Sequence, residues 1–274
     1  MFQSKRKPQT SLGSALSMLE VTYHCIVRSV RIQHNNAFIA IGMNMLQAVM
    51  FVGAFYLMFS IMGLRSAGLR GDFMLYIMSG IFMYLSHIRA LSAVMGADGP
   101  TSAMMQHAPM TTIISITGAA LSSLYAQTFS LFLILFIYHM LWNPIYIEDP
   151  LAAYGMFLLA WFTGCCFGLM LLVLKPWFPQ TVQMIMMVYM RVNMLASGKM
   201  FVANALPGFM VAMFDWNPLF HIIDQARGFT FSNYFPRNSN WEYAFWVGVT
   251  FLVIGMMGEF YTRKHASASW YARR

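Results

Sequence analysis

The sequence predicts an all-α membrane protein. Six long apolar runs fill most of the 274 residues, 59% of the residues are hydrophobic, and only 9% are charged. The hydrocarbon core of a bilayer is about 30 Å thick, so a spanning helix needs about 20 apolar residues. A helix also pairs its backbone N–H and C=O groups within the segment, as lipid requires. We therefore expect six transmembrane helices in one compact domain, because they leave little chain for a soluble domain.

The distribution of positive charge predicts the orientation of these helices. The net charge is +8, and 17 residues are Lys or Arg. With a cytoplasmic N-terminus, ten of these 17 lie inside, four lie outside, and three fall within or at the ends of spans. The positive-inside rule then places both termini in the cytoplasm, as an even number of spans requires. No nucleic-acid partner is expected, because the basic residues flank apolar runs and form no stripe.

Residues 1–34 are expected to form a cytoplasmic tail and an amphipathic interface helix. Apolar side chains recur there at helical spacing, at Leu12, Leu16, Leu19, Tyr23, Ile26, Val27 and Val30. Such a helix lies along the cytoplasmic membrane surface or packs on a soluble partner, and the two interpretations are compatible.

Residues 35–262 form the predicted six-span domain, followed by a cytoplasmic tail at 263–274. The runs are Phe38–Met62, Phe73–Val94, Ile113–Trp142, Leu151–Leu174, Val182–Phe201 and Trp241–Tyr261. In the fourth run, Gly164 and Gly168 form a small-xxx-small pair that permits close helix packing.

Two of the segments that connect the apolar runs are expected to be more than simple turns. Residues 94–110 form a cytoplasmic segment in which Gly99-Pro100 breaks the chain and Pro109 stops a short helix. Residues 202–240 are too apolar for a plain loop. We expect them to form a broken, re-entrant pair of short helices on the outer side, with a backbone shielded by protein.

The chain shows no catalytic or ATPase motif. Gly198-Lys199 is only a fragment of a P-loop, and no zinc-protease or nucleophile-elbow motif occurs. His221 and Asp224, three residues apart, leave open a catalytic dyad, although a structural hydrogen bond is the simpler explanation. The 27 methionines are interpreted as packing residues, so no metal site is expected.

Two cations in the fifth run point to an anionic substrate. A charge inside a membrane is costly and normally faces a protein interior or a wet cavity. Arg191 and Lys199 would lie about 80° apart on one helix. Arg191 is nearer the centre and is the favoured cation, whereas Lys199 has the alternative of extending to the outer interface. Arg89 is expected to extend toward the inner interface.

The order of these parts resembles the permeases of polysaccharide-exporting ABC transporters, in particular the capsular polysaccharide branch. The clearest local similarity is Asp215-Trp-Asn-Pro-Leu-Phe-His-Ile-Ile-Asp-Gln-Ala-Arg227. The family shows there an Asn-Pro-(apolar)-x-His stretch, then an acidic or polar position and Arg. Ala196-Ser-Gly-Lys-Met-Phe201, before Leu206-Pro207, is similar to the family's small-residue stretch ahead of a Leu-Pro turn. The uncharged loop 104–109 departs from the family's basic loop.

The resemblance implies a homodimer that frames a channel in the bacterial inner membrane. It implies two separate ATP-binding subunits, which hold ATP and magnesium, while this chain binds no cofactor and is no enzyme. The cargo implied is a lipid-linked, often acidic capsular polysaccharide. Membrane lipid and periplasmic and outer-membrane export components complete the set of partners.

Residue roles follow from this interpretation. The substrate channel is assigned to Arg191, Lys199, Tyr189, Phe51 and Phe55. ATPase coupling is assigned to the amphipathic helix and to Gly96, Asp98, Pro100, Gln106 and Pro109. The outer gate is assigned to Asn217, His221, Asp224 and Arg227. Three alternatives stay open: a lipid or drug exporter on the same scaffold, an intramembrane transferase or hydrolase using His221 and Asp224, and a passive channel.

Overall fold

The computed structural model describes residues 19–28, 37–61, 63, 72–99, 102 and 111–265, and within these ranges it contains helices and loops but no strand. The long helices are α2 (Ala37–Ile61), α3 (Phe73–Met95), α4 (Thr112–Leu141), α5 (Pro150–Leu174), α6 (Pro179–Ala196) and α9 (Trp241–His265). Between α6 and α9 lie the 3-10 turn η2 (Ala203–Ala205) and the short helices α7 (Gly208–Phe214) and α8 (Pro218–Thr230). The all-α class is therefore confirmed for the described residues.

Five of the described helices are long and apolar enough to cross a bilayer. They are α3, α4, α5, α9 and the Gly42–Ile61 part of α2. These findings indicate a multi-pass membrane protein. The 18-residue helix α6 is not among the five, because polar side chains interrupt it and it ends at Ala196. The sixth span therefore stays a prediction.

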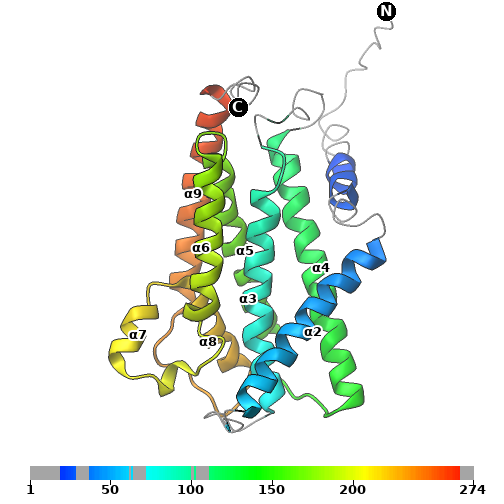
Figure 1. Cartoon of the computed structure of the whole chain (residues 1–274), viewed down its shortest axis with the longest axis vertical. Helices are drawn as coiled ribbons and strands as arrows, with labels where there is room; N and C mark the ends of the chain where they lie inside the picture. The colour runs from blue at the N-terminus through cyan, green and yellow to red at the C-terminus, as the bar shows by residue number, and fades with distance from the viewer. Residues whose placement is uncertain are drawn as a thin grey trace, which may run out of the picture.

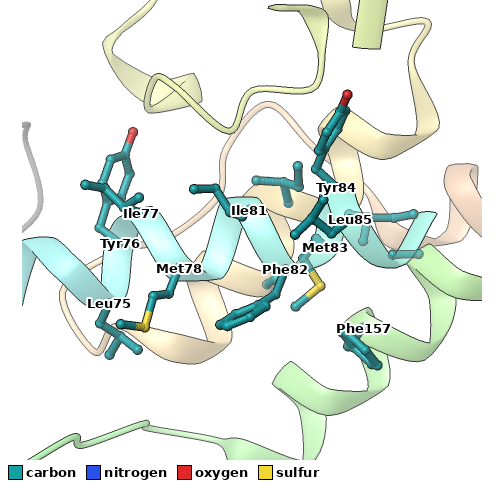
Figure 2. Packing of buried hydrophobic residues seen from close by; sticks show 14 of the residues in the cluster. Leu75, Tyr76, Ile77, Met78, Ile81, Phe82, Met83, Tyr84, Leu85 and Phe157 are labelled. Atoms are coloured by element: carbon teal, nitrogen blue, oxygen red, sulfur yellow. The ribbon is translucent and has the colours of Figure 1, made fainter. Parts of the chain in front are cut away.

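Helices α3 and α5 form the centre of the bundle, between α4 on one side and α6 and α9 on the other (Figure 1). Figure 2 shows apolar side chains leaving α3 on opposite sides, with Leu75 and Phe82 on one side and Ile81 on the other. All three are buried. A helix that is apolar all round is a buried helix.

Two glycines allow α5 to approach α3 closely. A Cβ atom on Gly164 would lie 2.3 Å from the backbone oxygen of His87, and one on Gly168 would lie 2.7 Å from the backbone oxygen of Leu91. Only a hydrogen atom fits at these distances. The predicted packing role of Gly164 and Gly168 is confirmed.

The N-terminal helix is described in part. Residues 19–28 are helical, and their exposed side chains include Leu19 and Tyr23. This helix packs on α4, where a Cβ atom on Gly118 would lie 2.9 Å from the Cβ atom of Cys25. The remainder of the predicted interface helix lies outside the described residues.

Helix α2 is tilted across α3 and α4 (Figure 1). The C-terminal end of α2 packs tightly on α3, with the ring centroids of Phe59 and Phe73 5.7 Å apart. At the same end of the bundle, α7 and α8 occupy the region where a broken helical pair was predicted. Their depth in a membrane stays a prediction.

Candidate functional site

The chain turns sharply where α6 ends. Gly198 has a φ of +77°, a conformation that residues with a side chain rarely adopt, and a Cβ atom there would lie 2.9 Å from the ring of Phe220. The helix therefore stops at Ala196, and Lys199 lies beyond it. The predicted angle between Arg191 and Lys199 is wrong, because the two residues are not on one continuous helix.

Lys199 is buried, with 3% of its surface exposed. Its Nζ atom lies 3.4 Å from the ring centroid of Tyr84, and 5.2 and 5.6 Å from those of Phe55 and Phe51. The electron-rich faces of such rings attract a cation. Nζ has no hydrogen-bond partner in the described part of the chain. Lys199 thus occupies an aromatic cage and does not extend to an interface.

The cage lies deep in the bundle. Tyr84 is 11 residues from Met95 at the C-terminal end of the 23-residue helix α3. At 1.5 Å per residue this separation is about 17 Å, roughly half the length of the helix. A charged group at such depth is costly unless something compensates for it, and such groups mark functional sites more often than structural ones.

The other predicted channel residues are placed differently. Arg191 is exposed on α6, away from the cage. Tyr189 stacks on Phe167 with centroids 4.2 Å apart. The structure therefore brings together Lys199, Phe51 and Phe55 from the predicted set, but not Arg191 or Tyr189. Tyr84 was missed as a cage member, since nothing local in the second run distinguishes it from its apolar neighbours.

Tyr189 belongs to a buried hydrogen-bond network centred on His87. Nδ1 of His87 lies 3.2 Å from the carbonyl oxygen of Ala160 and 3.1 Å from Oγ1 of Thr163. A carbonyl oxygen only accepts, so Nδ1 carries the proton. Nε2 then accepts from the hydroxyl of Tyr189 at 2.9 Å. His87 thereby ties α3 to both α5 and α6.

A cavity of about 740 Å³ lies beside the cage, bounded by α2, α3, α6 and Met200. Its lining residues are Met43, Asn44, Leu46, Gln47, Met50, Phe51, Ala54, Phe55, Met58, Arg89, Met194 and Met200. Phe51 and Phe55 contribute to both the cavity wall and the cage, so the cavity and the cage adjoin at these two residues.

Arg227 of α8 holds the turn that positions Lys199. Its guanidinium donates to the carbonyl oxygens of Gly198 at 2.8 Å, Lys199 at 2.8 Å and Phe201 at 2.7 Å. The guanidinium carbon lies 4.3 Å from the ring centroid of Tyr76. One side chain from 28 residues away thus satisfies three backbone acceptors.

Asn217 and His221 anchor the N-terminal part of α8. Oδ1 of Asn217 caps the helix by accepting from the N–H of Leu219, and Nδ2 donates to Oδ1 of Asn193 in α6 at 2.9 Å. Nδ1 of His221 accepts from the N–H of Asn240 at 3.0 Å. Nε2 of His221 therefore carries the proton and donates to the carbonyl oxygen of Asp215 at 2.7 Å.

Asp224 accepts hydrogen bonds from the loop before α9. Its donors are Oγ of Ser239 at 2.7 Å and the hydroxyl of Tyr234. Burial and the neighbouring carboxylate raise the pKa of Tyr234, so its hydroxyl keeps the donated proton. Neither His221 nor Asp224 hydrogen-bonds to the other in the described residues, so the dyad is not assembled. The four predicted gate residues lie together on α8 and its cap, and their role as a gate stays a prediction.

The described part of the predicted coupling segment packs against the helix bundle. The N–H of Gly96 closes α3 by donating to the carbonyl oxygen of Ser92 at 2.9 Å. The N–H of Asp98 donates to Oγ of Ser115 in α4 at 3.1 Å. Pro100, Gln106 and Pro109 lie outside the described residues.

Fold and site together define a helical multi-pass membrane protein with a caged cation and an adjoining cavity. No protein-family model matches the chain, and no curated protein matches it.

Proposed function

We propose that the chain is the transmembrane subunit of an ATP-driven exporter that moves a lipid-linked, acidic capsular polysaccharide across the bacterial inner membrane. The observation that carries this proposal is the buried ammonium of Lys199, which is surrounded by aromatic rings and has no hydrogen-bond partner among the described residues. A cation attracts the acidic groups of such a glycan, and aromatic faces stack on sugar rings. Displacement of the rings of Phe51 and Phe55 would present the ammonium of Lys199 and these aromatic faces to one ligand.

The energy for transport comes, in this proposal, from two separate ATPase subunits that hold ATP and magnesium. The sequence has no P-loop of its own. Two chains form a homodimer around the channel, α6 acts as the sixth span, and both termini are cytoplasmic. Periplasmic and outer-membrane components would continue the export path, and the chain itself is no enzyme.

The contacts of α4 support a shared docking surface for the ATPase. Ser115 receives the hydrogen bond from Asp98, and Gly118 receives the helix that contains Cys25. Ser115 and Gly118 are three residues apart, so they lie on neighbouring positions of one helix face. The coupling segment and the N-terminal helix therefore meet at the same end of α4, where one partner can contact both.

The outer end of the channel is assigned to α8 and its contacts. Arg227 and Asn217 connect α8 to the end of α6 and to the turn that carries Lys199. A movement of α8 would therefore move Lys199, which links the proposed gate to the proposed binding group.

The proposal is tested by deleting the chain from its host and restoring it as wild type, as Lys199→Met or as Lys264→Met. Lys264 is an exposed lysine of α9 and supplies a matched loss of charge. Surface glycan is measured by immunolabelling and the amount of inserted protein by blotting of membranes. We expect Lys199→Met to lower the amount of surface glycan about ten-fold, which corresponds to a loss of about 1.4 kcal/mol of binding free energy. The amount of Lys199→Met protein inserted in the membrane should equal that of wild type.

Two results would reject the proposal. Normal surface glycan in the deletion strain would show that the chain exports something else, such as a lipid or a drug. Equal export by Lys199→Met and Lys264→Met would remove Lys199 from the mechanism.

A further inference from the structure

The cavity beside α2 is polar at one end and apolar along the rest of its length. Its polar side chains are Arg89, Asn44 and Gln47. Arg89 lies six residues from the C-terminal end of α3, and Asn44 lies seven residues from the N-terminal end of α2. At 1.5 Å per residue these positions are about 9 and 10 Å from the two helix ends. The polar side chains of the cavity therefore come from the C-terminal half of α3 and the N-terminal half of α2.

Beyond this polar end, the lining is entirely apolar and continues deep into the bundle. Along α2 it runs through Met50, Phe51, Ala54 and Phe55 to Met58, with Met194 and Met200 opposite. Asn44 and Met58 are 14 residues apart, a distance of about 21 Å along the helix. Methionine side chains adapt to irregular apolar shapes, which suits a flexible hydrocarbon chain.

The electrostatics of the cavity favour an anion. None of its lining residues is acidic, and Arg89 forms no hydrogen bond or ion pair within the described residues. The buried ammonium of Lys199 lies over the rings of Phe51 and Phe55 and also has no hydrogen-bond partner in the described part of the chain. Arg89 thus places one positive charge at the polar end of the cavity, where a low dielectric weakens screening, and the ammonium of Lys199 lies next to the aromatic part of the wall.

We propose that this cavity binds a membrane lipid with a phosphate head group. The guanidinium of Arg89 pairs with the phosphate, the amides of Asn44 and Gln47 donate to its oxygens, and one hydrocarbon chain lies along α2 toward Met58. Arginine matches a phosphate through two parallel hydrogen bonds. The volume of about 740 Å³ is within the range of small-molecule sites. This site goes beyond the proposed function, because it holds lipid whether or not the chain exports glycan.

The length of the apolar wall favours a lipid over a free anion. Inorganic phosphate would occupy only the polar end and would leave the wall between Met50 and Met58 empty. A second copy of the chain could cover the exposed face of α2 with its own α2. That helix has no charged residue, so it would bring no negative charge to Arg89. A phosphate-bearing lipid satisfies both ends of the cavity at once.

The test uses the purified full chain and native mass spectrometry, without ATPase or glycan. Phosphatidylglycerol and diacylglycerol, which has the hydrocarbon chains but no phosphate, are titrated onto wild type, Arg89→Gln, Ala54→Trp and Arg263→Gln. Arg263 is an exposed arginine of α9 outside the cavity and controls for loss of charge. Ala54 is exposed and lines the apolar wall, so a tryptophan there fills the cavity without entering the core.

We expect wild type to bind phosphatidylglycerol about ten-fold more tightly than diacylglycerol, the effect of one charge-assisted hydrogen bond to the phosphate. Arg89→Gln should remove this preference, Ala54→Trp should weaken both lipids, and Arg263→Gln should match wild type. A preference retained in Arg89→Gln overturns the proposal. Competition by inorganic phosphate at equal strength overturns it in favour of a free-anion site. A change of oligomeric state in Ala54→Trp with unchanged lipid binding assigns the groove to a second copy of the chain.

Discussion

Arg227 is the side chain whose replacement should reveal most about the turn that holds Lys199. Arg227 is 1% exposed, and its guanidinium donates to three carbonyl oxygens, at 2.8, 2.8 and 2.7 Å. In Arg227→Met the apolar stem is kept, whereas the contact of the guanidinium with the ring of Tyr76 is lost. The three acceptors of Gly198, Lys199 and Phe201 lose their donor.

The magnitude follows from the number and kind of these bonds. A hydrogen bond to a charged group contributes about 1.5–3 kcal/mol, and a buried acceptor without a donor costs about 1–3 kcal/mol. Coupled bonds are not additive, so we expect a total loss of about 4 kcal/mol. A loss of 1 kcal/mol lowers the melting temperature by about 2–4 °C in a chain of this size. Arg227→Met should therefore melt about 10 °C below wild type.

Two variants set the scale for this measurement. Arg227→Lys keeps the charge but replaces a planar fork by a single ammonium, so it should lose about half as much stability. Arg263→Met removes an exposed guanidinium that lies 6.0 Å from the ring centroid of Phe260 and should melt within about 1 °C of wild type. Thermal unfolding of the purified proteins in one detergent measures all three.

A second readout separates the turn from global stability. Lys199 should resist an amine-reactive reagent in wild type and react in Arg227→Met, as determined by peptide mass spectrometry. The reasoning is refuted if Arg227→Met melts within about 2 °C of wild type. At about 4 °C per kcal/mol, so small a shift corresponds to a loss of only about 0.5 kcal/mol of stability. It is also refuted if Lys199 stays unreactive in a destabilised Arg227→Met protein, because the turn would then have other support.

The remaining predictions concern the centre of the bundle. Gly164→Ala places a Cβ atom 2.3 Å from the backbone oxygen of His87 and should cost about 3 kcal/mol. Gly155→Ala on the same helix meets nothing within 4 Å and should be neutral or stabilising; equal melting temperatures of the two variants would contradict the close crossing of α3 and α5. Tyr189→Phe leaves Nε2 of His87 without its donor at 2.9 Å and should cost about 1–3 kcal/mol. In a double-mutant cycle with His87→Phe, the two losses should be less than additive, and strict additivity would exclude the bond.

Several elements of the fold could be predicted because their signal is local. A membrane sets the length of each apolar run, so α2, α3, α4 and α5 begin and end within one residue of the runs predicted for them. Gly164 and Gly168 were recognised because four-residue spacing of small residues is itself the packing signal. The fifth run was extended too far, because Gly198 is compatible with an apolar run but turns the backbone to a φ of +77°.

The candidate site was predicted only in part. Lys199, Phe51 and Phe55 were selected as a cation and aromatic residues within apolar runs, and the structure brings them together. The expected extension of Arg89 toward the inner interface stays a prediction, and Arg89 lines a cavity that the sequence did not predict. That position depends on the tilt of α2 away from α3, which no pattern along either helix reports.

The amino-acid sequence by itself determined that this chain is a helical membrane protein without an ATPase motif, because hydrophobic length and motif spacing are properties of neighbouring residues. Only the tertiary structure decided that Lys199 is caged and Arg191 exposed. The physical reason is that the environment of Lys199 is built by Arg227, Tyr84 and the rings of α2, which are far from it in the chain and meet only when the helices pack.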